Sequence, residues 1–100
     1  MFAAVFEYRV DPSRTAAFEA TYGPSGEWAA LFGRADGYLG TEMWHDDATP
    51  GRYLLLDRWE SAHAYAAFHA AWATEYAALS DACAALYLAE IPFGRFSERS

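Results

Sequence analysis

The first segment of the chain begins apolar and then alternates between apolar and polar side chains. Residues 2–10, FAAVFEYRV, begin apolar and then place Phe6 and Tyr8 on one face and Glu7 and Arg9 on the other. A period of two residues is typical of a strand. We therefore expect the chain to begin with a β-strand.

Two segments with helical spacing follow this strand. Residues 11–23, DPSRTAAFEATYG, place Pro12 where a helix starts and Gly23 where it stops. Residues 24–37, PSGEWAALFGRADG, repeat the pattern with Ser25 as the expected cap. The apolar side chains of this second segment recur at helical spacing at Trp28, Leu31 and Phe32. The sequence predicts a first helix that is broken into two pieces.

The middle of the chain has the pattern of a β-hairpin. Residues 38–46, YLGTEMWHD, and 52–59, RYLLLDRW, are rich in strand formers, and the turn residues DATPG at 47–51 separate them. Leu54, Leu55 and Leu56 point alternately to both faces, which predicts that this strand is covered on both sides. Helices cover only one face of a two-layer protein, so we expect a second copy of the chain to cover the other, as a homodimer.

The remaining residues predict a long helix and a last strand. Ser61 is a good cap for a helix whose many alanines favour it to about residue 82. Residues 85–96, ALYLAEIPFGRF, read as a strand, and Pro92 indicates an edge or a bulge. The order strand, helix, strand, strand, helix, strand predicts an α+β fold, a ferredoxin-like sandwich formed by one domain over residues 1–100.

Composition and charge exclude several classes of partner. A chain of 100 residues that is 54% hydrophobic can bury the core of one domain. Its net charge of -7, with seven arginines and no lysine, argues against nucleic acid as a partner. No apolar run is long enough to span a membrane and no signal peptide is recognisable, so we expect a cytoplasmic protein. Cys83 is the only cysteine, which excludes an intramolecular disulfide and a thiolate metal site.

An aromatic stripe follows one face of the second predicted helix. At roughly 100° per residue, its members fall within about 80° of one another. They are Tyr65, Phe68, Trp72, Tyr76 and Leu79. One interpretation is a contact between helix and sheet. The other is a ligand pocket, because stiff rings fill space incompletely and the polar tips of Tyr and Trp need partners when buried.

Few polar side chains qualify as catalytic candidates. His69 lies at the edge of the stripe, where it can reach a cavity beneath the helix. Asp57 and Arg58 point to opposite sides of their strand, and Arg58 is expected either to orient a substrate oxygen or to form an ion pair across a subunit interface. His45 precedes Asp46 and Asp47, but neighbouring residues of an extended chain diverge, so we expect a solvated turn and no metal site.

Three stretches resemble a known family: YGPSGEWAALF at 22–32, GYLGTE at 37–42 and YLLLDRWES at 53–61. They are similar to small proteins of the antibiotic biosynthesis monooxygenase superfamily, and the likeness extends from residue 5 to about residue 90. The resemblance implies a dimeric α/β barrel in which the sheets of two copies pack together. Members include enzymes that oxidise hydroquinones and anthrones without metal or flavin. In them the protein supplies a dry aromatic cavity and polar groups that favour the substrate anion.

The resemblance implies that the polar and aromatic candidates line one pocket between the helices and the sheet. Tyr8, Arg58 and His69 would act as base or anion stabiliser on a small hydroxyaromatic or quinol, with no cofactor. The substrate-binding side chains would be Phe6, Trp28, Phe32, Tyr65, Phe68, Trp72 and Tyr76. The alternative is a non-catalytic binding or stress-response protein that holds a small aromatic molecule in the same cavity.

The superfamily also includes haem-degrading enzymes, which carry an Asn on the first strand and a Trp and a His on the long helix. The matching positions here are Tyr8, Phe68 and approximately Ala78. Because all three differ, the resemblance argues against haem degradation.

Overall fold

One layer of the structure is a four-stranded antiparallel sheet in the order β2-β3-β1-β4. The computed structural model describes residues 1–99. The strands are β1 (Phe2–Arg9), β2 (Tyr38–His45), β3 (Arg52–Trp59) and β4 (Ala89–Ser97). The chain therefore places its first and third strands in the centre of the sheet and leaves β2 and β4 at the edges.

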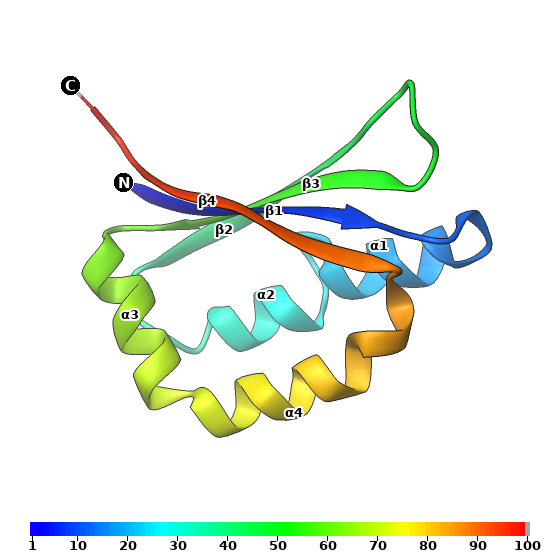
Figure 1. Ribbon diagram of the computed structural model, residues 1–100. Helices are drawn as coiled ribbons and strands as arrows, with labels where there is room; N and C mark the ends of the chain where they lie inside the picture. The colour runs from blue at the N-terminus through cyan, green and yellow to red at the C-terminus, as the bar shows by residue number, and fades with distance from the viewer. Residues whose placement is uncertain (100) are drawn as a thin grey trace.

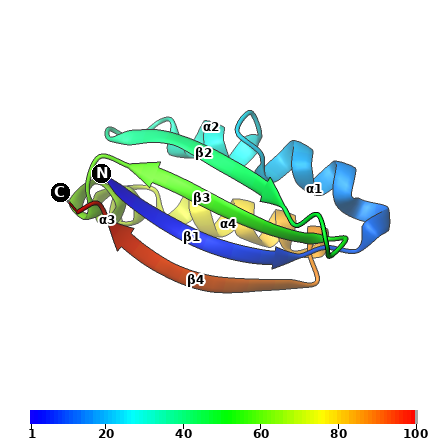
Figure 2. The ribbon, with the colours of Figure 1, turned by 90° about the horizontal axis from the view of Figure 1, so that it is seen from above.

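Within residues 1–99, the helices all lie on one face of this sheet, and the other face carries none (Figure 1). Figure 2, seen from above, shows the bare face with the helices behind it. The helical segments are η1 (Pro12–Arg14), α1 (Thr15–Tyr22), α2 (Glu27–Phe32), α3 (Ala62–Ala71), α4 (Ala73–Cys83) and η2 (Ala84–Leu86). This two-layer α+β arrangement confirms the predicted ferredoxin-like fold. No helix within residues 1–99 is long and apolar enough to cross a membrane.

The boundaries of the helices follow from a few residues. The Ser61 hydroxyl accepts a hydrogen bond of 3.1 Å from the Ala64 N–H, as expected of an N-cap. Gly23 ends α1, which confirms that the first helical region is broken in two. The prediction that Ser25 caps the second helix is wrong, because Gly26 is the N-cap residue of α2. A Cβ at Gly26 would lie 2.2 Å from the carbonyl oxygen of Thr21, so this close approach requires glycine.

The prediction of one helix to about residue 82 is wrong, because the segment breaks at Trp72. This residue leaves the helical region with φ -115° and ψ 25°, and it separates α3 from α4. The change of direction allows both helices to contact the same layer of rings. Phe68 on α3 packs against Phe32, and Tyr76 on α4 packs against Trp28, with centroid distances of 5.1 and 5.0 Å.

Each edge strand carries one residue more than its partner. In β2 the register shifts between Tyr38 and Gly40, which leaves Leu39 without a partner on β3. In β4, Gly94 and Pro92 pair with the consecutive β1 residues Val5 and Phe6, so Phe93 between them has no partner on β1. The position of Pro92 on an edge strand beside a bulge confirms the prediction for that residue.

The core lies between the sheet and the helices and consists mainly of aromatic rings. Its largest fully buried side chains are Trp59, Tyr53, Phe18 and Phe68. Leu55 points into this core, whereas Leu54 and Leu56 are half-buried on the bare face. The leucine alternation is thus confirmed, and the cover expected over the bare face stays a prediction.

Candidate functional site

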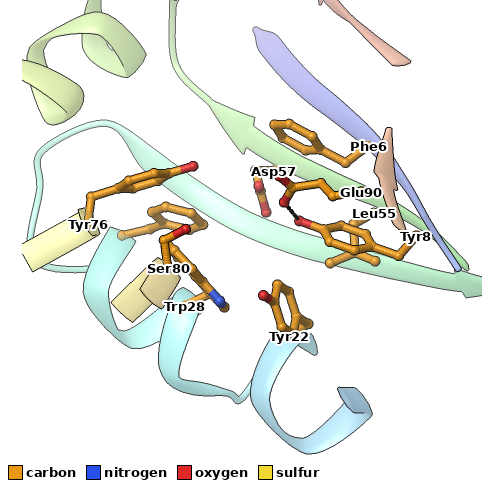
Figure 3. A pocket seen from close by; sticks show the side chains of 10 residues that line it. Phe6, Tyr8, Tyr22, Trp28, Leu55, Asp57, Tyr76, Ser80 and Glu90 are labelled. Atoms are coloured by element: carbon orange, nitrogen blue, oxygen red, sulfur yellow. Dashed lines mark hydrogen bonds between the residues drawn. The ribbon is translucent and has the colours of Figure 1, made fainter. Parts of the chain in front are cut away.

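A small cavity lies between the helices and the inner face of the sheet (Figure 3). Its volume is about 30 Å³, which is room for one water molecule. The lining side chains are Phe6, Tyr8, Tyr22, Trp28, Phe32, Leu55, Asp57, Tyr76, Ser80 and Glu90. We call this space the inner cavity. Its walls combine aromatic rings with a small number of polar tips, as is typical of ligand sites.

Asp57 is the buried acid of the inner cavity. It lies on β3 between Leu55 and Trp59 and is 8% exposed. Desolvation raises the pKa of its carboxyl from 3.8 to about 6, and the hydrogen bond from Thr41 opposes this rise. No positively charged group contributes to this pKa. Asp57 therefore exchanges its proton near neutral pH, as a general base must.

A chain of hydroxyl groups orients the Asp57 carboxylate. Thr41 donates a hydrogen bond of 2.8 Å to Asp57 Oδ1, so its oxygen accepts the 2.6 Å hydrogen bond from the hydroxyl of Tyr38. Tyr38 and Thr41 are three residues apart and would point to opposite faces of a regular strand. The extra residue Leu39 brings them to the same face, so the bulge in β2 builds this chain.

Tyr8 is held by a carboxylate on the neighbouring edge strand. Its hydroxyl donates a hydrogen bond to Glu90 Oε2, as the dashed line in Figure 3 marks. Burial and the negative charge of Glu90 raise the pKa of Tyr8 far above its usual value of 10. Tyr8 therefore remains a neutral phenol whose proton is already directed to Glu90.

The helices contribute the other polar tips of the inner cavity. Figure 3 shows the Tyr76 and Ser80 hydroxyls of α4 turned toward the cavity, opposite the sheet. The indole N–H of Trp28 is buried without a hydrogen-bond partner among the described residues. Burial raises the pKa of Tyr76 to about 12, so its hydroxyl is a donor at neutral pH. These groups offer hydrogen bonds to a polar atom that enters the cavity.

The structure brings together most of the aromatic residues predicted for the pocket. Those on the inner cavity are Phe6, Tyr8, Trp28, Phe32 and Tyr76. Tyr65 and His69 line a second, larger hollow beside it, of about 270 Å³, which we call the outer hollow. Its other lining residues are Val5, Phe6, Tyr76, Pro92, Gly94 and Arg95. The two spaces share Phe6 and Tyr76 and are therefore neighbours.

Three predicted site residues lie away from both spaces. Phe68 is 1% exposed and packs against Phe32 and Trp59 in the core. Trp72 packs against the edge of the core without lining either space, and the guanidinium carbon of Arg34 is 5.8 Å from its ring centroid. Arg58 points to the bare face of the sheet, because it neighbours the inward-facing Asp57.

The contacts of Arg58 fix its position on the bare face. Its Nε lies 3.5 Å from Glu42 Oε2, and both side chains are partly exposed. Arg58 is thus separated from the inner cavity by the sheet. Its alternative role, in an ion pair across a subunit interface, stays a prediction.

Sequence reasoning missed Asp57, Glu90, Tyr22 and Ser80 as cavity residues. The signal for Asp57 was the alternation of Leu55, Asp57 and Trp59, which puts the acid on the apolar side of β3. What the pattern does not show is the lack of a neighbouring cation. The pattern also does not show how far the folded chain buries this carboxyl, and burial is what raises its pKa.

Comparison with known proteins identifies the family. The family model for antibiotic biosynthesis monooxygenase matches residues 1–79, which is most of the chain. The chain belongs to the antibiotic biosynthesis monooxygenase family. No curated protein sequence matches it.

Solved structures share the fold of this family member at low sequence identity. SnoaB, a cofactor-independent oxygenase from Streptomyces nogalater, is 19% identical with a TM-score of 0.71, covering 99% of this chain and 93% of SnoaB. A Bordetella bronchiseptica protein that carries the name of the same family is 20% identical with a TM-score of 0.77, covering 99% and 97% of the two chains. Rv0793 from Mycobacterium tuberculosis is 14% identical with a TM-score of 0.65, covering 99% and 95%. These similarities establish the fold of the antibiotic biosynthesis monooxygenase family member.

The turn between β2 and β3 of this family member has no metal-binding cluster. His45 is exposed and its ring lies tilted against Tyr53 at a centroid distance of 5.0 Å, and Asp46 accepts a 2.9 Å hydrogen bond from Arg52. Within residues 1–99, no group of histidine, cysteine and carboxylate side chains converges as metal ligands would.

Proposed function

We propose that this family member is a monooxygenase that oxidises a small hydroxyaromatic or quinol without metal or flavin, with Asp57 as the base. The observation that carries the proposal is the buried Asp57 carboxyl, with a pKa of about 6 and an aromatic cavity in front of it. Such a group is ionised at pH 7 and poorly solvated. It therefore accepts a phenolic proton more readily than an exposed aspartate does.

The reaction begins when Asp57 takes the proton of the substrate hydroxyl. The electron-rich phenolate gives one electron to dioxygen, and the resulting superoxide and substrate radical join through a new C–O bond. The proton held by Asp57 passes to the outer peroxide oxygen. Asp57 then takes the proton from the same ring carbon. As the C=O bond forms, the O–O bond breaks and hydroxide leaves. The hydroxide takes the proton from Asp57. One O₂ thus becomes the quinone oxygen and one water, and Asp57 is regenerated.

The two neighbouring spaces suit different parts of such a substrate. The inner cavity, at about 30 Å³, admits a hydroxyl-sized group but no ring. The outer hollow, at about 270 Å³, approaches the size of small-ligand sites and is walled by Phe6, Tyr65 and Tyr76. We place the ring in the outer hollow with its hydroxyl directed past Phe6 and Tyr76 toward Asp57. His69, on the wall of the hollow, would then contact the ring.

We also infer that the protein is a homodimer that pairs through the bare face of the sheet. Trp44 is 60% exposed and Phe93 is 59% exposed on this face, beside the half-buried Leu54 and Leu56. Large exposed apolar side chains among charged ones on an uncovered sheet face are typical of an interface with another chain. Two copies pairing in this way would form the dimeric barrel that the sequence resemblance implies.

Oxygen consumption tests the proposed reaction. Purified metal-free protein is given 1,5-dihydroxynaphthalene or anthrone, and uptake is compared with that of heat-treated protein. With ¹⁸O₂, we expect one labelled atom in the quinone and one in water. Asp57→Asn should reduce the rate by a factor of about 100 or more, since general base catalysis contributes about that much. The matched control, Asp81→Asn on the exposed surface of α4, should leave it unchanged.

Two results would contradict the proposal. Uptake equal to that of heat-treated protein with every compound rejects a monooxygenase for this substrate class. If some of these compounds still bind, the site is a binding site without catalysis. An unchanged rate in Asp57→Asn would show that another group takes the proton.

A further inference from the structure

The outer hollow contains one cation, Arg95, and no acid among its lining residues. The guanidinium carbon of Arg95 lies 5.3 Å from the ring centroid of Tyr65, so the cation extends over the wall of the hollow. Within residues 1–99, Arg95 forms no ion pair with a carboxylate. Its charge is therefore available in a protein whose net charge is -7.

The bulge in β4 directs Arg95 toward this hollow. Glu90 pairs with Tyr8 and Arg95 pairs with Ala4, and both partners face the helices. Residues five apart would face opposite sides of a regular strand. The extra residue Phe93 restores the phase, so Glu90 and Arg95, which are both exposed, lie on the helix side of the sheet. Without this bulge, Arg95 would point to the bare face of the sheet.

The groups around Arg95 are neutral donors. His69 packs against Tyr65 and Tyr76 with centroid distances of 4.5 and 4.8 Å. Burial and the positive charge of Arg95 lower the pKa of His69, so its imidazole is neutral at pH 7. Burial raises the pKa of Tyr65, so its phenol is neutral as well. The outer hollow thus offers one positive charge beside uncharged N–H and O–H groups.

We propose that the outer hollow selects an aromatic substrate that carries an acidic group, with Arg95 as the counter-ion of its carboxylate. This inference rests on the proposed function, because it assigns the other end of the substrate that Asp57 deprotonates. A planar guanidinium pairs well with a carboxylate through two parallel hydrogen bonds. The aromatic ring separates the carboxylate from Asp57, so the two negative charges do not meet. The substrate class is a hydroxyaryl carboxylic acid with its hydroxyl and carboxyl at opposite ends.

Binding of a matched pair of probes tests the inference. The probes are 6-hydroxy-2-naphthoic acid and its neutral analogue 6-hydroxy-2-naphthamide, measured at pH 7.5 by isothermal titration calorimetry with the full chain. We expect the acid to bind at least about tenfold more tightly than the amide. Arg95→Gln should remove this preference, because it should weaken binding of the acid by far more than binding of the amide. Arg34→Gln is the matched control, because Arg34 also lies over an aromatic ring, that of Trp72, but away from both spaces.

Other results would overturn the inference. Equal affinity of the unaltered protein for acid and amide, or binding of neither, rejects an acid-selective hollow. An equal loss of both affinities in Arg95→Gln would make Arg95 a part of the wall and not a counter-ion. Oxygen uptake decides the proposed function separately: uptake with 1,5-dihydroxynaphthalene but no preference for the acid rejects only the present inference. Tight binding of the acid without uptake of oxygen by any compound rejects only the monooxygenase.

Discussion

The hydroxyl of Thr41 on β2 donates a hydrogen bond of 2.8 Å to the buried carboxylate of Asp57 on β3. This bond favours the ionised form of Asp57 and limits the rise in pKa that burial causes. The two residues are directly paired across the strands, so the bond is fixed by the backbone. The proton affinity of the proposed base therefore depends on a residue that does not line the inner cavity.

Thr41→Val should raise the pKa of Asp57 further. A hydrogen bond to a charged group contributes about 1.5 kcal/mol, which corresponds to about one pKa unit. The rate of oxygen uptake should rise with pH through the pKa of Asp57, which is about 6 in the unaltered protein and should be higher in the variant. The measurement is the pH dependence of kcat/KM from pH 5 to 8.5. Thr74→Val, an exposed change on α4, is the control, and an unshifted profile in Thr41→Val would contradict the role of this bond.

Asp57→Asn should stabilise the protein at pH 7 while it removes activity. The folded protein holds the Asp57 proton up to about pH 6, and the unfolded chain releases it near pH 4. Since the folded state binds more protons in that interval, this group's contribution to stability is lost as pH rises from about 4 through 6. Two pKa units correspond to about 3 kcal/mol. Urea unfolding should therefore show variant and unaltered protein differing by up to about 3 kcal/mol at pH 7 and by little at pH 4.

A pH-independent difference between the two proteins would refute this origin of the effect. Glu7 titrates with the opposite sign, because hydrogen bonds from Arg52 and Arg9 lower its pKa to about 2. Both proteins keep Glu7, so its contribution cancels in the difference.

Phe68→Ala should destabilise the fold and is unsuitable as a test of the site. The ring is 1% exposed and packs between Phe32 and Trp59, so its loss leaves a cavity in the core. Removal of such a ring costs about 3–5 kcal/mol of unfolding free energy. Trp72→Ala, which removes a half-buried ring beside Arg34, should cost less than half as much. Equal costs by urea unfolding would mean that Phe68 is no deeper in the core than Trp72.

Phe93→Glu should separate the proposed dimer. The ring is exposed on the bare face, where a partner sheet would bury it, and a buried unpaired charge costs several kcal/mol. Sedimentation velocity should give a dimer for the unaltered protein and a monomer for the variant, with the same circular dichroism spectrum. Ala78→Glu, on the exposed side of α4, should remain a dimer. A monomeric unaltered protein at micromolar concentration would exclude pairing of this strength.

The sequence was most informative where the strands and helices are regular. In β3 every residue from Arg52 to Trp59 has a partner on β1, so the predicted alternation of Leu54 to Leu56 between the two faces held. The helix cap at Ser61 was equally predictable, because it depends only on the residues near it. The order of elements then specified the fold.

Prediction failed where one residue changes the phase of a pattern. The stripe from Tyr65 to Tyr76 assumed 100° per residue throughout, but the helix breaks at Trp72, and the ring of Trp72 lines neither space. On β4, Phe93 shifts the alternation, so Arg95 could not be assigned to a face from the sequence. Pro92 indicates that a bulge or an edge is near, but the partner strand decides which residue is the extra one.

The two bulges lie on the edge strands, and each of them orients polar side chains that support the residues of the central strands. The hydrogen-bonded hydroxyls of Tyr38 and Thr41 belong to β2, and Arg95 and Glu90 belong to β4. Asp57 and Tyr8 belong to the central strands. Edge strands open locally at lower free energy than the core, and amide hydrogen exchange reports such opening. Fraying of either edge would disconnect the base from its hydrogen-bond donors, or the ligand's acid group from its cation, while β1 and β3 remained protected from exchange. The arrangement of side chains that the proposed reaction needs should therefore be lost at a lower free energy than the folded core.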